Sequence, residues 1–110
     1  MKYNRYISDS ALVSEIGLGA WQLGNNSGWQ SMSENNAVEL VQKALELGII
    51  FFDIAPNYGR GTSEERLGKA LKGIDRSTIV LNTKFGHSDE GKTNYNSNYI
   101  RESLEGSLKR

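Results

Sequence analysis

The chain has 110 residues, with 13 basic and 13 acidic side chains and a sequence pI of about 6.6. This length fits one small domain, and the balanced charge argues against nucleic acid or an anionic membrane as a partner. The chain has no cysteine, which excludes disulfides and cysteine-ligated metal, and neither a signal peptide nor an apolar run long enough to span a bilayer is present, so we expect a cytoplasmic protein.

The first elements predicted in chain order are a hairpin and a strand. Residues 2–7 and 12–16 flank a polar turn at 8–10, which is typical of a short β-hairpin. Residues 16–21 form an apolar segment with two glycines, suited to a buried strand that runs into the polar loop 22–32. The chain therefore opens with β-structure.

A helix and a second strand follow. The helix is predicted by apolar residues at i, i+3, i+4, i+7 and i+8, which share one face: Ala37, Leu40, Val41, Ala44 and Leu45. Ser31 and Glu34 have the spacing of a capping box, and Gly48 stands where a helix would end. Residues 49–52 are continuously apolar, which predicts a strand buried on both faces of a parallel sheet.

The same pattern then repeats. Thr62 and Glu65 have capping-box spacing ahead of a second helix, and residues 78–81 predict a third buried strand. Apolar residues four apart, from Ile100 to Leu108, predict a third helix that is still running at Arg110. The order is a hairpin followed by βαβαβα, an α/β fold with a parallel sheet. It is either a small open sheet or the first part of a larger one, and the last helix, with no strand after it, favours the larger fold.

Three chemically active side chains are expected at one edge of this sheet. Asp53 closes the second predicted strand, Tyr58 follows in the loop, and Lys84 lies just past the third strand. The carboxyl ends of parallel strands open onto the same side. A phenol is a weak acid, but a nearby ammonium stabilises the phenolate, and a carboxylate keeps the ammonium charged. The trio predicts a proton donor, able for example to protonate the oxygen of a carbonyl as a hydride reaches its carbon, and it identifies no substrate.

The segments GLGAWQLG, FFDIAPNYGRGTSEERLGKAL and IVLNTKFG, in this order and spacing, resemble the aldo-keto reductase family. The resemblance implies a (β/α)8 TIM barrel with an N-terminal hairpin at its base. Residues 1–110 would then be a partial NADP-dependent oxidoreductase domain, about three of eight βα units, truncated before the fourth strand.

The resemblance also implies a function. The family reduces aldehydes and ketones with NADPH through a tetrad of Asp, Tyr, Lys and His. By motif, Asp53, Tyr58 and Lys84 occupy the first three places, with Tyr58 as the acid, and Ala20, Trp21 and Asp53 are expected beside the nicotinamide ribose of NADP. The substrate would be a small carbonyl compound, and no metal is expected.

The fourth tetrad position has no match. The family's histidine closes the fourth strand, and His87, the only histidine, follows Lys84 instead. We therefore expect the chain alone to be inactive. Two other readings stay open: a non-catalytic truncated remnant, and a nucleotide-sensing regulator that binds a partner through the same fold. Trp21 and Trp29 are candidates for lining a substrate pocket, and for Trp29 a core or rim position is an equal alternative.

Overall fold

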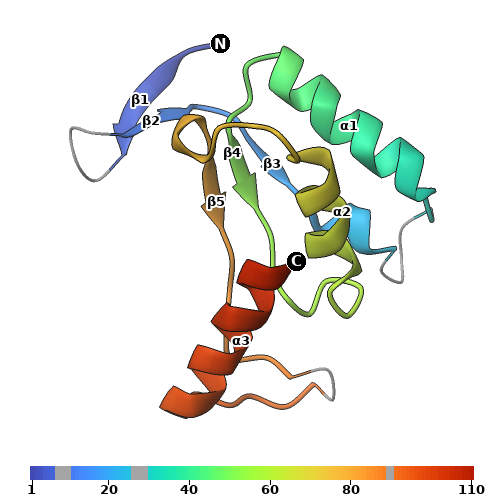
Figure 1. Ribbon diagram of the computed structural model, residues 1–110, viewed down its shortest axis with the longest axis vertical. Coiled ribbons are helices and arrows are strands. Elements are labelled where there is room, and N and C mark those ends of the chain that lie inside the picture. The colour runs from blue at the N-terminus through green and yellow to red at the C-terminus, as the bar shows by residue number, and fades with distance from the viewer. Residues whose placement is uncertain (7–10, 26–29, 89–90) are drawn as a thin grey trace.

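The computed structural model describes residues 1–6, 11–25, 30–88 and 91–110 (Figure 1). The predicted hairpin is present: β1 (Tyr3–Tyr6) pairs antiparallel with β2 (Ala11–Ser14). The turn expected at residues 8–10 lies outside the described residues, as does Trp29.

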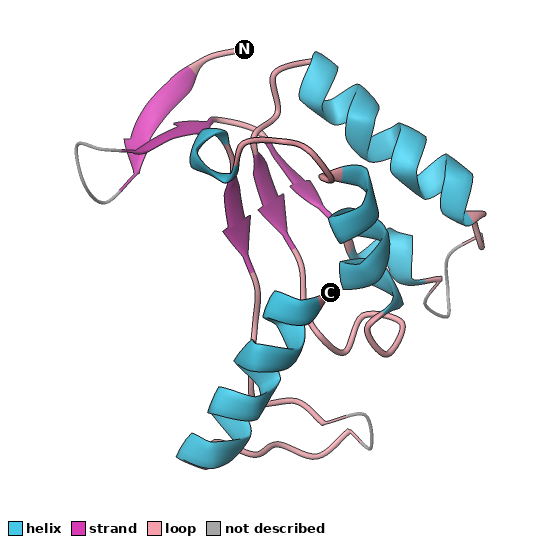
Figure 2. Cartoon of the chain, viewed as in Figure 1, coloured by secondary structure: helices cyan, strands magenta, loops and turns pink. Residues whose placement is uncertain are grey.

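The rest of the chain alternates strands and helices as predicted. Three short strands form a parallel sheet in the order β3-β4-β5: β3 (Gly17–Gly19), β4 (Phe51–Asp53) and β5 (Val80–Asn82). The helices are α1 (Glu34–Glu46), α2 (Thr62–Ala70) and α3 (Ser97–Lys109), with short 3-10 turns η1 (Trp21–Gly24) and η2 (Arg76–Thr78). Figure 2 shows α1 and α2 side by side on one side of the sheet.

The core lies between the sheet and these two helices. On β4, Phe52 is fully buried and Ile54 just beyond it nearly so, whereas Phe51 and Asp53 on the opposite face are half-buried. Leu81 of β5 is 37% exposed. The prediction of strands buried on both faces is therefore wrong for the described structure, because α1 and α2 cover only one face of the sheet.

Both capping predictions are also wrong. The side chain of Ser33, not Ser31, caps α1, because its Oγ accepts a hydrogen bond of 3.1 Å from the Asn36 amide. The N-cap of α2 is Gly61, at a φ of 93°, and it makes no side-chain cap bond. A glycine adopts this left-handed conformation without the strain that a Cβ would add. The predicted end of α1 is confirmed: Gly48 has a φ of 83° just after the helix.

Helix α3 projects beyond the carboxyl ends of the strands, and only its last turn reaches α2 (Figure 1). A Cβ at Gly68 would collide with the carbonyl group of Arg110, so a glycine is needed where the two helices meet. None of the residues of α3, all of which are described, is buried, and Leu104 and Leu108 are 52% and 78% exposed. The apolar face of α3 is therefore open to solvent along most of its length.

Candidate active site

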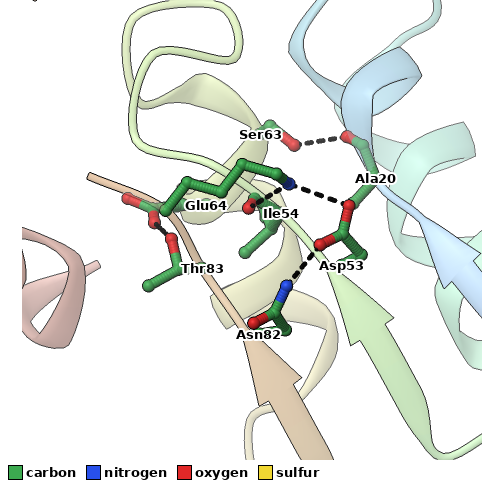
Figure 3. Close-up of polar contacts among 8 residues, drawn as sticks. Ala20, Asp53, Ile54, Ser63, Glu64, Asn82 and Thr83 are labelled. Carbon is green, nitrogen blue, oxygen red and sulfur yellow. Dashed lines mark hydrogen bonds and ion pairs between the residues drawn. The ribbon is translucent and has the colours of Figure 1, made fainter. Parts of the chain in front are cut away.

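The ends of β4 and β5 bring Asp53 and Lys84 together. Parallel pairing sets Asp53 of β4 opposite Asn82 of β5. Lys84, two residues beyond Asn82, reaches back past the end of β5 to Asp53. The Nζ of Lys84 lies 2.8 Å from the Oδ2 of Asp53, and it also donates to the carbonyl oxygen of Ile54 at 3.0 Å. The Nδ2 of Asn82 donates to the other carboxylate oxygen of Asp53 at 2.6 Å (Figure 3). The carboxylate thus has one donor on each oxygen.

The third predicted residue joins this pair from the loop after β4. The turn is closed by a hydrogen bond of 3.2 Å from the amide of Tyr58 to the carbonyl of Ala55. The Nζ of Lys84 lies 5.0 Å from the centre of the Tyr58 ring, within the range of a cation–π contact. The structure therefore gathers Asp53, Tyr58 and Lys84 at one place on the carboxyl edge of the sheet.

The neighbours of the two charged groups favour their ionised forms. For Asp53, burial opposes ionisation, but the hydrogen bonds from Lys84 and Asn82 outweigh it and hold the pKa of the carboxyl below its ordinary 3.8. For Lys84, burial again opposes the charge, yet Asp53 and then Tyr58 raise the pKa of the ammonium above its ordinary 10.5. At neutral pH the site therefore holds an ammonium paired with a carboxylate, beside the ring of Tyr58.

Ala20 lies next to this trio but is fully buried. Its amide donates to the backbone oxygen of Asp53 at 2.8 Å, and its carbonyl accepts from the Oγ of buried Ser63 at 2.5 Å. Both polar groups of the Ala20 backbone are thus used inside the protein. Trp21, which follows it, is 38% exposed.

Helix α2 fixes this segment at two points. Besides the Ser63 contact with Ala20, the guanidinium of Arg66 donates to the carbonyl of Leu23 at 2.7 Å. These two bonds, from side chains three residues apart on α2, hold both ends of η1 against the helix.

A tight backbone contact joins η1 to the loop that carries Tyr58. A Cβ added at Gly59 would lie 2.7 Å from the carbonyl carbon of Gly24, and one added at Gly24 would lie 2.8 Å from the carbonyl carbon of Tyr58. No side chain fits at either position without displacing backbone. The two glycines therefore set the distance between η1 and the proton-donor candidate.

Several site residues were missed by the sequence reading. Asn82 is two residues before Lys84, so the two-residue period of a strand was a usable signal that both face Asp53. Glu64 is three residues before Leu67 and so shares the apolar face of α2, where it is 6% exposed. For the contact of Gly24 with Gly59 the sequence offers no signal.

His87 stands apart from the trio. It lies in the loop between β5 and α3, where it forms an isolated antiparallel bridge with Thr93. It also lines a cavity of about 670 Å³ together with Arg60 of the loop after β4 and Tyr99 of α3.

This chain resembles a known protein family and several solved structures. The model of the aldo/keto reductase family matches residues 15–110. The chain belongs to the aldo/keto reductase family. Asp53 at the end of β4, Tyr58 in the following loop and Lys84 after β5 all lie within the matched residues. No helix in the described part of this family member has the length and apolar character needed to cross a membrane.

Individual aldo-keto reductases match most of the chain. L-galactose dehydrogenase of Arabidopsis thaliana is 41% identical over 100 residues, which are 89% of this chain and 30% of that protein. The holo form of AKR11C1 from Bacillus halodurans superposes with a TM-score of 0.80 at 30% identity, over 99% of this chain and 36% of the other. A reductase from Klebsiella pneumoniae in complex with NADPH superposes with a TM-score of 0.70 at 26% identity, over 90% and 31%.

The chain thus spans about a third of the length of the aldo-keto reductases that it matches. This agrees with the predicted fold class, an N-terminal hairpin and βαβαβα as the first portion of a (β/α)8 barrel.

Proposed function

We propose that the chain contributes Asp53, Tyr58 and Lys84 to an NADP(H)-dependent site that reduces aldehydes or ketones to alcohols. The observation that carries the proposal is the position of the Lys84 ammonium, 2.8 Å from the carboxylate of Asp53 and 5.0 Å from the centre of the Tyr58 ring. Family membership and the NADPH complex of the Klebsiella relative support the choice of reaction and cofactor.

The proposed chemistry divides the work between these side chains. NADPH, when bound, supplies the hydride that reaches the carbonyl carbon. Tyr58 donates its phenolic proton to the carbonyl oxygen, so that the product is an alcohol. The Lys84 ammonium stabilises the phenolate that remains, and Asp53, with one oxygen on Lys84 and the other on Asn82, fixes the position of that ammonium.

The residues present fit the ribose end of such a cofactor in part. The Asp53 side chain is 40% exposed and offers carboxylate oxygens to a ribose hydroxyl, and Trp21, which follows Ala20 in the chain, is 38% exposed. Ala20 has no exposed surface, and its amide and carbonyl are already bonded. We therefore assign direct contact to Asp53 and Trp21, and to Ala20 a supporting role through its bond to the Asp53 backbone.

A chimera tests the proposal directly. The chain would replace the matching 36% of the Bacillus halodurans reductase, which supplies the remainder of a barrel. We expect this chimera to bind NADPH, followed by nucleotide fluorescence, and to reduce a generic aromatic aldehyde. A folded chimera that binds NADPH but turns over no aldehyde would overturn the proposal. The 110 residues alone are expected to show no turnover, because no residue matches the tetrad histidine.

A second candidate function, partner binding without catalysis, is favoured by one observation. Leu104 and Leu108, one helical turn apart on α3, are 52% and 78% exposed, and contiguous exposed apolar side chains are typical of protein–protein contact sites. The chimera separates the candidates, since a remnant that had lost its catalytic competence would leave the assembled barrel inactive.

A further inference from the structure

The end of β5 is held by side-chain hydrogen bonds on two opposite sides, to Asp53 and to Glu64. Successive side chains of an extended chain point to opposite faces. Asn82 and Lys84 both reach Asp53, while Thr83 between them donates its hydroxyl to the Oε1 of Glu64 at 2.8 Å. Figure 3 shows Asn82 turned toward Asp53 and Thr83 turned toward Glu64. The proposed catalytic side of the strand and the helix-facing side are thus anchored by consecutive residues.

Glu64 is a buried carboxylate that the proposed reaction does not use. Its side chain is 5% exposed, and its two oxygens have separate partners. Oε1 accepts from Thr83, and Oε2 accepts from the guanidinium of Arg110, with Nε at 2.8 Å and Nη2 at 2.7 Å. The arginine compensates the buried charge of Glu64 at Oε2. Oε1 faces Thr83 at the end of β5.

Side chains, rather than the sheet, hold the strand at this point. The last bond of the β4–β5 ladder runs from the amide of Ile54 to the carbonyl of Asn82 at 2.8 Å. Beyond it, the contacts found for Thr83 and Lys84 within the described residues are made by their side chains. The backbone up to Lys84 is therefore held by side-chain hydrogen bonds, and the bond between Thr83 and Glu64 is the one made on the side of α2.

We propose that Glu64 is a positioning residue, which through Thr83 holds the end of β5 so that the Lys84 ammonium reaches Asp53. The importance of this for proton donation rests on the proposed function, but the positioning itself does not. Glu64 acts from α2, on the side of the strand away from Asp53, and touches none of the three proposed catalytic residues in the contacts described.

The test measures how well Lys84 is protected from an amine-modifying reagent. The chain is acetylated under limiting conditions without NADPH or aldehyde, and the rate at each lysine is followed by mass spectrometry. Lys69 of α2, which pairs with Glu34 of α1 rather than with any residue of the site, serves as the internal reference. We expect Thr83→Val, which removes only the hydroxyl, to raise the rate at Lys84 by roughly 2- to 10-fold, the effect of one lost hydrogen bond. Thr83→Ser should restore the original rate.

Two further variants sharpen the test. Glu64→Met, of similar volume but with no acceptor, should raise the rate at Lys84 as Thr83→Val does. Thr78→Val is the matched control, because it removes a hydroxyl bond of 2.7 Å to the Asp75 carbonyl at the other end of the same segment. The proposal is overturned if Thr83→Val leaves the rate at Lys84 unchanged, or if Thr78→Val raises it equally. Because no cofactor or substrate is present, either result is independent of whether the chimera reduces an aldehyde.

Discussion

Lys84 and Asp53 are 31 positions apart in the chain, yet the Nζ of one lies 2.8 Å from the Oδ2 of the other. They meet because β4 and β5 are adjacent and parallel, so that both residues emerge at the same edge. The side chains are 42% and 40% exposed, and solvent therefore weakens the pair. The pair therefore adds little to the stability of the fold, while it keeps an ammonium 5.0 Å from the centre of the Tyr58 ring.

The first prediction concerns the stability of the chain in acid. The folded structure lowers the pKa of Asp53, so this stabilisation is complete above the ordinary value of 3.8 and is lost as the pH falls through the lower folded value. For an ion pair this exposed, the contribution is at most about 1 kcal/mol. Urea unfolding of the wild type and of Lys84→Met, near neutral pH and below pH 3.8, should show a difference that shrinks in acid. A difference that stayed constant with pH would mean that the charge of Asp53 is not involved.

The second prediction concerns the proton donor. In the chimera, Tyr58→Phe should lower the rate of hydride transfer by about 10²–10⁴, the usual contribution of a general acid. Binding of NADPH should be nearly unchanged, since the proposed contacts to the ribose come from other residues. Tyr3→Phe is the control, because its hydroxyl bonds to the Gly48 carbonyl in a distant part of the fold. If single-turnover rates of Tyr58→Phe equal those of the parent, another group donates the proton.

The third prediction concerns Gly24 and Gly59, which are in contact where η1 meets the loop that carries Tyr58. Gly24→Ala would press a methyl group against the Tyr58 carbonyl carbon, 2.8 Å from the ideal Cβ position. Forcing an atom into such a contact typically costs about 1–3 kcal/mol. Gly19→Ala is the matched control, since a Cβ there meets no atom within 4 Å. In thermal unfolding, Gly24→Ala should be less stable than Gly19→Ala. Equal stability of the two variants would show that η1 and the loop shift apart at little cost in free energy.

The sequence predicted which site residues come together more accurately than it predicted the first residue of each strand. Asp53 and Lys84 could be placed together because both follow apolar runs that end at the same edge of a parallel sheet. The start of β4 was placed too early, at Ile49, because hydrophobicity does not report hydrogen-bond partners: the Ile49 amide bonds to Ala44 at the end of α1, and the Ile50 amide bonds to the side chain of Ser14. Hydrogen bonds of this kind form with neighbours that only the folded chain brings close.

The adjacent acids of α2 illustrate the same limit. Glu64 and Glu65 are chemically identical, and a capping-box pattern drew attention to Glu65. The structure buries Glu64 and exposes Glu65, because the helix begins after Gly61 and its inward face is set by Leu67. The apolar phase of the helix could have identified the buried acid, but its partner Thr83 could not be known without the sheet.

The last prediction concerns association of the chain with itself. Within the described residues, β3 and β5 are each paired on one side only, and unpaired strand edges favour contacts between chains. The exposed Leu104 and Leu108 of α3, which line a cavity together with Leu81 of β5, add an apolar surface. We therefore expect the isolated chain to form oligomers or aggregates at about 100 μM, measured by sedimentation velocity.

Two variants distinguish association through the leucines of α3 from nonspecific association through any exposed apolar side chain. Replacing Leu104 and Leu108 by lysine should reduce association several-fold, because each charge would have to be desolvated in the contact. Leu47→Lys is the control: Leu47 is 60% exposed, but it lies at the end of α1 and outside this surface. A monodisperse monomer that unfolds cooperatively would contradict the prediction, and it would show that these three strands and their helices form a self-sufficient domain. If the leucine variants associate as strongly as the wild type, the open strand edges rather than α3 drive the contact.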